Sequence, residues 1–159
     1  MNNSTNSTIV FSMGLPAAGK STWISANLSE THTIIDPDAV KETHPDYDPK
    51  NPQALHAWSK EITDRMFLDA LTAGSGLFVV DGTGTNSEKM IRRMKQARAA
   101  GFAVELVYVA CSLETSLKRN AARARVVPPA ILIEKAADIS TSFEVVSPYA
   151  DNVRVIEND

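Results

Sequence analysis

The feature that most constrains this chain is the loop at residues 14–22, GLPAAGKST, which directly follows the apolar run 8–13. Its pattern, G-x-x-x-x-G-K-[ST] between a strand and a helix, is typical of a loop that holds phosphate groups. The glycines let backbone N–H groups close around an anion, Lys20 reaches the terminal phosphates, and the Ser21 hydroxyl can ligate Mg²⁺. Residues 22–28 indicate a helix whose N-terminal dipole faces the same phosphates. The pattern predicts a nucleoside triphosphate bound by Gly14, Ala17, Ala18, Gly19, Lys20, Ser21 and Thr22.

The chain of 159 residues is long enough for one compact core and too short for two. We expect a disordered polar tail over residues 1–7 and a single domain over residues 8–159. With 43% hydrophobic and 22% charged residues, and no apolar run of membrane-spanning length, the sequence indicates a soluble cytoplasmic protein without a membrane partner. The single cysteine, Cys111, excludes an intramolecular disulfide and a cysteine-based zinc site.

Five short apolar runs alternate with helical patterns along the chain, at residues 8–13, 33–35, 77–80, 103–109 and 152–156. This alternation predicts an α/β fold, a doubly wound parallel five-stranded sheet with helices on both faces. Helical spacing over residues 55–70 ends at Gly74, a second helix opens at the capping-box pattern 85–88 and ends at Gly101, and a last helix begins at residues 128–129. In such sheets ligands bind beyond the carboxyl ends of the strands.

Carboxylates follow the predicted second strand at that edge of the sheet. A phosphotransferase needs a base for the attacking hydroxyl, and we assign this role first to Asp38 and second to Asp36. Both could instead cap the short helix that starts near Ala39, and we expect one of the two to do so. Lys41, three residues beyond Asp38, lies on the same helix face and could hold an anionic group of the acceptor.

The third strand and the segment after the fourth add further candidates. Asp81 could orient Mg²⁺ or contact the acceptor, or it could only cap the following turn, which also contains Thr83. The basic run 118–125 fits an arginine-bearing lid over the phosphates, since Arg119 and Arg123 are four residues apart and would project from one helix face. A solvent-exposed basic helix end is the alternative. The predicted acceptor-binding residues are Asp36, Lys41, Asp81, Thr83 and Arg125.

The overall charge limits which partners the chain can bind. A net charge of −3 and a pI near 5.6 argue against a protein that coats nucleic acid along its surface, but binding to one nucleic-acid end stays open. The cations are concentrated in the second half of the chain, and we interpret those over residues 89–98 as a solvated helix face.

Together these residues resemble the zeta-toxin and polynucleotide-kinase group of P-loop kinases over nearly the whole chain. The resemblance to zeta toxins rests on residues 35–41 (IDPDAVK), 44–48 (HPDYD), 81–84 (DGTG) and 153–156 (VRVI), and that to polynucleotide kinases on 19–23 (GKSTW) and 118–123 (KRNAAR). It implies a P-loop NTPase fold with ATP and Mg²⁺ as cofactors, and Asp38 as general base. It further implies that Lys41 replaces an acceptor-binding arginine, that Arg119 contacts ATP and that Arg123 stabilises the transition state.

The leading hypothesis is a kinase with Asp38, Lys20 and Arg123 as catalytic residues and Ser21 and Asp81 at the metal. It would move the γ-phosphate of ATP to a hydroxyl of a nucleotide or nucleic-acid acceptor, such as a 5′-hydroxyl end or a hydroxymethylated base. A zeta-toxin-like kinase of a UDP-N-acetyl amino sugar is the alternative, and an ATP-hydrolysing switch is a third. We expect no obligate protein partner.

Overall fold

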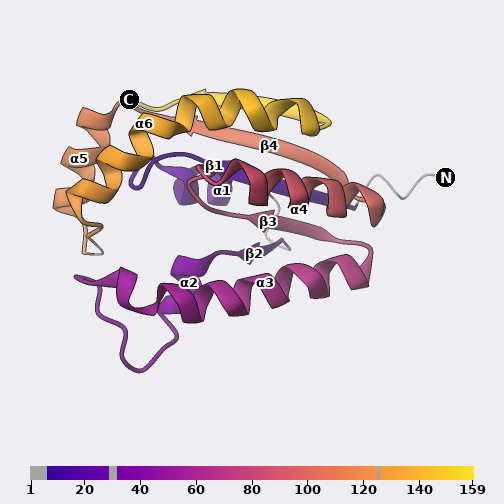
Figure 1. Cartoon of the computed structure of the whole chain (residues 1–159), viewed down its shortest axis with the longest axis horizontal. Helices are drawn as coiled ribbons and strands as arrows, with labels where there is room; N and C mark the ends of the chain where they lie inside the picture. Colours follow the sequence, from indigo (N-terminus) through magenta and orange to yellow (C-terminus); the bar gives the residue numbers. More distant parts are fainter. Residues whose placement is uncertain (1–6, 29–31, 125) are drawn as a thin grey trace.

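The computed structural model of the chain describes residues 7–28, 32–124 and 126–159 (Figure 1). Of the predicted tail, residues 1–6 lie outside this range. Ser7 is buried, and its carbonyl oxygen accepts a hydrogen bond of 2.9 Å from the Ala103 amide. The folded part of the chain therefore includes Ser7.

A parallel sheet of five strands forms the centre of the described chain, in the order β2-β3-β1-β4-β5. This order confirms the predicted doubly wound topology, because the chain goes from β1 to the edge strand β2, returns through β3 to the side of β1, and then adds β4 and β5 on the other side of β1. Two strands are each one residue longer than predicted. The strands are β1 (Thr8–Met13), β2 (Thr33–Ile35), β3 (Leu77–Val80), β4 (Ala103–Ala110) and β5 (Asn152–Glu157).

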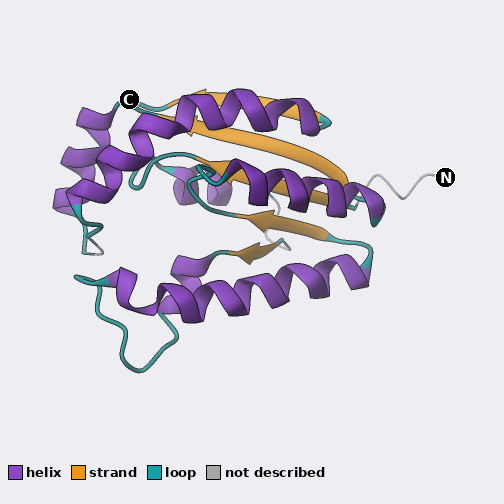
Figure 2. Ribbon diagram, viewed as in Figure 1, coloured by secondary structure: helices purple, strands orange, loops and turns teal. Residues whose placement is uncertain are grey.

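Helices cover both faces of the sheet, as Figure 2 shows. The larger apolar cluster packs α3, α4 and α6 against one face, with the Phe11 ring edge-on to Phe67. The smaller cluster packs Ile24 of α1 against Val10, Val79 and Val107 on the other face. The helices are α1 (Lys20–Asn27), α2 (Pro37–Lys41), α3 (His56–Ala73), α4 (Ser87–Ala99), α5 (Leu113–Ala122) and α6 (Pro129–Val146), with 3₁₀ turns η2 (Pro52–Leu55) and η3 (Ser147–Tyr149).

The helix ends follow the local sequence. Gly74 adopts φ 73° at the end of α3 and so supplies the left-handed cap that the sequence predicts. At the start of α4 the cap is Asn86, whose side chain accepts a hydrogen bond from the Lys89 amide. The capping-box prediction over 85–88 placed the helix start correctly, but the capping residue is Asn86 rather than Thr85 because an Asn oxygen reaches the third amide of the helix.

The carboxyl ends of the strands meet at one edge, and two loops are joined there. The Gly14 amide of the loop after β1 donates a 3.1 Å hydrogen bond to the Thr83 carbonyl oxygen of the loop after β3. Gly84 has φ +81°, and a Cβ at this position would collide with Met13 Cβ. Only glycine allows the two loops to lie so close together.

Candidate functional site

The loop at residues 14–19 has the backbone of an anion cradle. Positive φ angles occur at Gly19 (103°) and at Ala17 (66°), which is the only non-glycine residue with positive φ in the described chain. The α1 helix begins directly after Gly19, so its free N–H groups point into the cradle. Lys20 Nζ donates to the carbonyl oxygens of Gly14 (3.0 Å) and Leu15 (3.4 Å) within the loop. The backbone N–H groups of the loop and the Lys20 ammonium group can therefore both bind phosphate oxygens.

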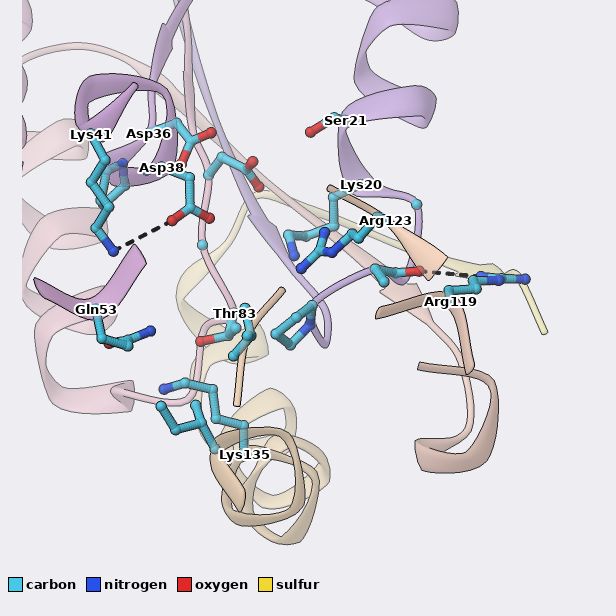
Figure 3. A pocket seen from close by; sticks show the side chains of 18 of the residues that line it. Lys20, Ser21, Asp36, Asp38, Lys41, Gln53, Thr83, Arg119, Arg123 and Lys135 are labelled. Atoms are coloured by element: carbon cyan, nitrogen blue, oxygen red, sulfur yellow. Dashed lines mark hydrogen bonds and ion pairs between the residues drawn. The ribbon is translucent and has the colours of Figure 1, made fainter. Parts of the chain in front are cut away.

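A cavity of about 770 Å³ opens beside this loop, and Figure 3 shows its side chains. It brings together groups from the loop after β1, from α2, from the loop after β3 and from the segment around α5. Of the predicted site residues, it is lined by Ala17, Gly19, Lys20, Ser21, Thr22, Asp36, Asp38, Lys41, Asp81, Thr83, Arg119 and Arg123. Gly14 and Ala18 shape the loop without lining the cavity, and Arg125 lies outside the described residues.

The two candidate carboxylates after β2 have separate roles. Asp36 is the N-cap of α2, because its side chain accepts a 2.9 Å hydrogen bond from the Asp38 amide. Asp38 Oδ1 lies 3.6 Å from Lys41 Nζ, and Asp38 is 42% exposed whereas Lys41 is only 2% exposed. The capping alternative therefore applies to Asp36, while the Asp38 carboxylate faces the cavity on the side opposite Lys20 (Figure 3).

Crowding of carboxylates changes the titration of Asp36. Burial, followed by the negative charges of Asp81 and Asp38, raises the pKa of Asp36 to about 7. The hydrogen bond from the Asp38 amide and the charge of Lys20 oppose this shift. Asp81 in turn accepts a short hydrogen bond from the Ser12 hydroxyl on β1. The site thus concentrates negative charge on one wall of the cavity.

The residues present fit a magnesium ion bound with a nucleotide. Mg²⁺ takes oxygen ligands, usually one or two protein oxygens together with phosphate oxygens and water. The Ser21 hydroxyl and the Asp81 carboxylate line the same cavity. Burial first, and then the charges of Asp81 and Asp38, raise the pKa of Asp36 beside them, so a cation at this wall would find carboxylate oxygens close together.

The arginine segment differs from the sequence prediction. Helix α5 ends at Ala122, and Arg123 follows with extended backbone angles (φ −100°, ψ 161°). Arg119 and Arg123 therefore do not share a helix face. They still line the same cavity, and Arg119 Nη1 lies 3.4 Å from the Ala18 carbonyl oxygen of the phosphate loop.

Two buried side chains hold this segment in place. The Ser116 hydroxyl donates a 2.6 Å hydrogen bond to the Pro16 carbonyl oxygen, which ties α5 to the phosphate loop. Asn120 makes two hydrogen bonds with the backbone of Val127, which fold the chain back after Arg123. Arg119 is thus held on α5, and Arg123 is held on a braced turn between α5 and α6.

Comparison with known proteins decides the family. The family described as the AAA domain matches residues 9–141, which is most of the chain. The chain belongs to the AAA domain family. No curated protein matches this AAA domain in sequence.

Solved structures share the fold of this AAA domain at low sequence identity. A chain of the PezAT chromosomal toxin-antitoxin system of Streptococcus pneumoniae is 16% identical, with a TM-score of 0.74 over 99% of this chain and 71% of that chain. Shikimate kinase from Acinetobacter baumannii in complex with shikimate is 18% identical, with a TM-score of 0.57 over 98% of this chain and 86% of that chain. A chain of the Pnkp1/Rnl/Hen1 RNA repair complex is 13% identical, with a TM-score of 0.64 over 90% of this chain and 47% of that chain.

These similarities confirm, at the level of the fold, the resemblance to P-loop kinases of the zeta-toxin and polynucleotide-kinase group. The AAA domain spans about half the length of the RNA-repair chain. Across residues 7–28, 32–124 and 126–159, no helix is long and apolar enough to cross a membrane.

Sequence reasoning missed several residues that line the cavity of the AAA domain. They come from elements to which no motif drew attention, namely η2, the start of α3, α6 and the end of the chain. Lys135 of α6 donates a 3.4 Å hydrogen bond to the Thr85 hydroxyl, and Asn158 donates one of 2.7 Å to the Ala18 carbonyl oxygen. The additional lining residues include Gln53, His56, Ile131, Lys135 and Asn158.

The two tryptophans of the AAA domain lie on different helices of the site. Trp23 follows the phosphate loop on α1, where Arg154 of β5 lies over its ring at 5.7 Å. Trp58 lies in the first turn of α3 and packs edge-on against His44, with ring centroids 4.7 Å apart. One ring therefore belongs to the nucleotide side of the site, and the other to the α2–α3 side.

Proposed function

We propose that this AAA domain is an ATP-dependent phosphotransferase that moves the γ-phosphate to a hydroxyl of a nucleotide or nucleic-acid acceptor. The observation that carries the proposal is the position of Asp38: its partly exposed carboxylate lies in the same cavity as Lys20 of the phosphate loop. A hydrolase or a switch also needs the phosphate loop, but it does not need a general base that accepts the proton of an acceptor hydroxyl.

The chemistry assigns one role to each group. The acceptor hydroxyl oxygen attacks the γ-phosphorus as the bond to the bridging oxygen of ADP breaks, and the hydroxyl proton passes to the Asp38 carboxylate. Lys20 and Arg123 stabilise the charge that spreads over the phosphoryl oxygens, and Arg119 binds the nucleotide. Ser21 and Asp81 would hold a magnesium ion, which would supply positive charge to neutralise the phosphate oxygens.

Lys41 supports an acceptor that carries an anionic group near the hydroxyl. Its ammonium is almost fully buried, yet it borders the cavity next to Asp38. A buried lysine is costly to maintain without a partner anion, and Asp38 at 3.6 Å supplies only part of that compensation. Asp36, Thr83 and Arg125 are the further proposed acceptor residues.

Two acceptor classes remain to be separated. A polynucleotide end is supported by the shared fold with a chain of an RNA repair complex, and a UDP-N-acetyl amino sugar by the shared fold with a chain of a toxin-antitoxin system. The second class would also bring a protein partner, such as an antitoxin. An ATP-hydrolysing switch is the least supported alternative.

The test offers γ-labelled ATP and Mg²⁺ to the protein with three acceptors in parallel: 5′-hydroxyl oligonucleotides, hydroxymethyl-base DNA and UDP-N-acetylhexosamines. Label in either nucleic acid supports the leading proposal, and label in the sugar nucleotide selects the alternative. The matched variants are Asp38→Asn and Asp69→Asn, because Asp69 is an exposed carboxylate of α3 outside the cavity. Release of free phosphate alone, unaffected by Asp38→Asn, would refute the kinase assignment.

A further inference from the structure

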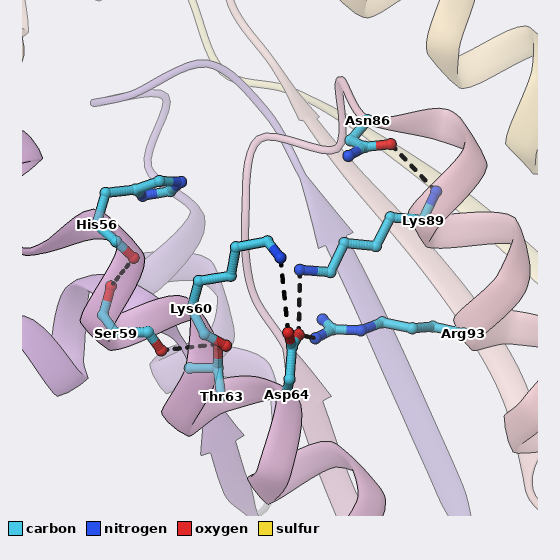
Figure 4. A network of polar contacts seen from close by, with 8 residues as sticks. All are labelled: His56, Ser59, Lys60, Thr63, Asp64, Asn86, Lys89 and Arg93. Atoms are coloured by element: carbon cyan, nitrogen blue, oxygen red, sulfur yellow. Dashed lines mark hydrogen bonds and ion pairs between the residues drawn. The ribbon is translucent and has the colours of Figure 1, made fainter.

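Three cations converge on one carboxylate between α3 and α4. Asp64 of α3 lies 2.5 Å from Arg93 and 3.1 Å from Lys89, both on α4, and 3.7 Å from Lys60 on its own helix (Figure 4). One negative charge thus meets three positive charges. The side chains of Lys60 (51%) and Asp64 (41%) are exposed, whereas Lys89 (21%) and Arg93 (12%) are largely covered, so the network is open to solvent on the Lys60–Asp64 side.

This basic surface, defined by Lys60, Lys89 and Arg93, begins close to the cavity. His56 lines the cavity and starts α3, and Lys60 follows one turn later. Lys89 is likewise in the first turn of α4, which begins after the loop that carries Thr83. With a rise of 1.5 Å per residue, Asp64 lies about 12 Å along α3 from His56.

Charged groups of both the cavity and the basic surface shift the pKa of His56. Burial, then the positive charges of Lys41 and Lys135, lower the pKa of His56, with a smaller contribution from Lys89; the Asp38 charge opposes them. Cations of the cavity and of the basic surface therefore act on the same imidazole. On a chain with a net charge of −3, such a local positive region is a distinct feature.

We propose that the basic surface of Lys60, Lys89 and Arg93 binds the phosphodiester backbone of a single-stranded polynucleotide acceptor whose 5′-hydroxyl reaches Asp38. The inference rests on the proposed function and narrows its acceptor class. The three cations lie outside the cavity lining, with Lys60 one turn, about 6 Å, further along α3 than His56 and with Lys89 and Arg93 on α4. An acceptor that stays inside the cavity does not use them, whereas a strand that leaves the cavity extends over them. Asp64 then occupies the place of a phosphate and is displaced from its partners when the strand binds.

The experiment measures binding of fluorescent 5′-hydroxyl strands of two and eight nucleotides, as DNA and as RNA, by anisotropy at several salt concentrations. We expect the octanucleotide to bind at least tenfold more tightly than the dinucleotide at low salt. The double variant Lys60→Gln/Lys89→Gln should lose this length dependence and leave dinucleotide binding unchanged. Its log–log salt slope should fall by about 1.4, since each lost phosphate contact on a single strand contributes about 0.7.

Asp64→Asn gives the sharper test, because it removes the competing anion and keeps all three cations. We expect tighter octanucleotide binding, by threefold or more, even though the variant loses a structural contact. A purely structural network predicts no gain in binding. The charge-matched control for the double lysine variant is Lys50→Gln/Lys95→Gln, which removes two exposed lysines outside the basic surface.

The outcomes separate the two proposals. Equal affinity for both strand lengths, or no gain in Asp64→Asn, overturns the basic-surface proposal even if the protein phosphorylates a dinucleotide. Length-dependent binding without any labelled acceptor overturns the kinase proposal and leaves strand binding supported. Thermal unfolding of each variant shows whether lost binding reflects lost folding, and the Asp64→Asn arm still decides the question if the double lysine variant unfolds.

Discussion

Asn120 and Val127 are joined by a two-way hydrogen-bonded pair. The Asn120 amide nitrogen donates to the Val127 carbonyl oxygen at 2.7 Å, and the Val127 amide donates to Asn120 Oδ1 at 3.0 Å. Both residues are buried. Because this pair closes the turn that presents Arg123, the shape of the proposed catalytic segment depends on an amide that does not line the cavity.

Replacing Asn120→Ala should therefore weaken both folding and catalysis. Loss of the amide leaves two buried backbone groups without their partners, which costs about 1–3 kcal/mol each. We expect a lower melting temperature and a lower kcat, with ATP affinity close to that of the wild type. Asn27→Ala is the control, because this exposed amide donates to a carbonyl oxygen of its own helix. Unchanged kcat in Asn120→Ala would contradict the positioning role.

Asp38→Asn should lower phosphoryl transfer by roughly 10²–10⁴ while ATP binding stays nearly intact, because the amide cannot accept the hydroxyl proton. Lys20→Met should instead weaken nucleotide binding and transfer together. Single-turnover transfer and calorimetric titration with ATP separate the two effects. Equal loss of ATP affinity in both variants would show that Asp38 acts on the nucleotide rather than on the acceptor.

Two glycines with similar backbone angles should respond differently to alanine. Gly84 has φ +81° and no room for a Cβ beside Met13, whereas Gly74 has φ +73° and no neighbour within 4 Å of such a Cβ. Gly74→Ala should cost about 1 kcal/mol from backbone strain alone. Gly84→Ala should cost about 2–4 kcal/mol, since overpacking is added to the strain. Urea unfolding measures both, and similar losses would contradict the proposed contact between the loops.

The raised pKa of Asp36 predicts a fall in stability with pH for the metal-free protein. Between its unfolded value of 3.8 and its folded value of about 7, the folded state binds more protons than the unfolded state. The free energy of unfolding should therefore decrease as the pH rises through this range, by on the order of 4 kcal/mol. Asp36→Asn keeps a capping side chain and should abolish this decrease. The measurement is urea unfolding at pH 5 and pH 7.5 with a chelator present.

Asp64 should show the opposite dependence. Burial would raise its pKa, but the Lys89 hydrogen bond and the charges of Lys89, Arg93 and Lys60 outweigh burial and hold it below its usual value. Its stabilising contribution is thus present above pH 4 and is lost as the pH falls through the folded pKa. Asp64→Asn should destabilise the protein at pH 7 and have little effect near pH 2. A constant difference across this range would mean that the ion pairs contribute nothing.

The strands were predicted to within one residue, because the central strands β1, β3 and β4 are largely apolar runs, and the edge strands β2 and β5, although mostly exposed, still contain short runs of β-branched residues. The residues directly after them could be predicted as neighbours for the same reason, since the carboxyl ends of parallel strands meet at one edge. Gln53, Lys135 and Asn158 could not be predicted as site residues. They come from distant elements, and only the packing of η2, α6 and the end of the chain brings them to the cavity.

The end of α5 could not be predicted from the sequence for a different reason. The sequence has no glycine or proline near Ala122, and the four-residue spacing of Arg119 and Arg123 predicted one helix that includes both. In the structure the helix stops at Ala122, before Arg123, because Asn120 binds the Val127 backbone instead of facing solvent. Local propensity does not reveal such a contact, which forms only when the chain returns toward the start of α6.

The positions of the two tryptophans allow them to serve as intrinsic fluorescent probes. Trp23 lies on the helix that follows the phosphate loop, and Trp58 lies against His44 in the α2–α3 region, where we propose that the acceptor binds. The chain contains no other tryptophan. Variants that keep only one indole would therefore report by fluorescence whether nucleotide or acceptor arrives first, without any attached dye. The order of assembly of the ternary complex can then be followed in real time.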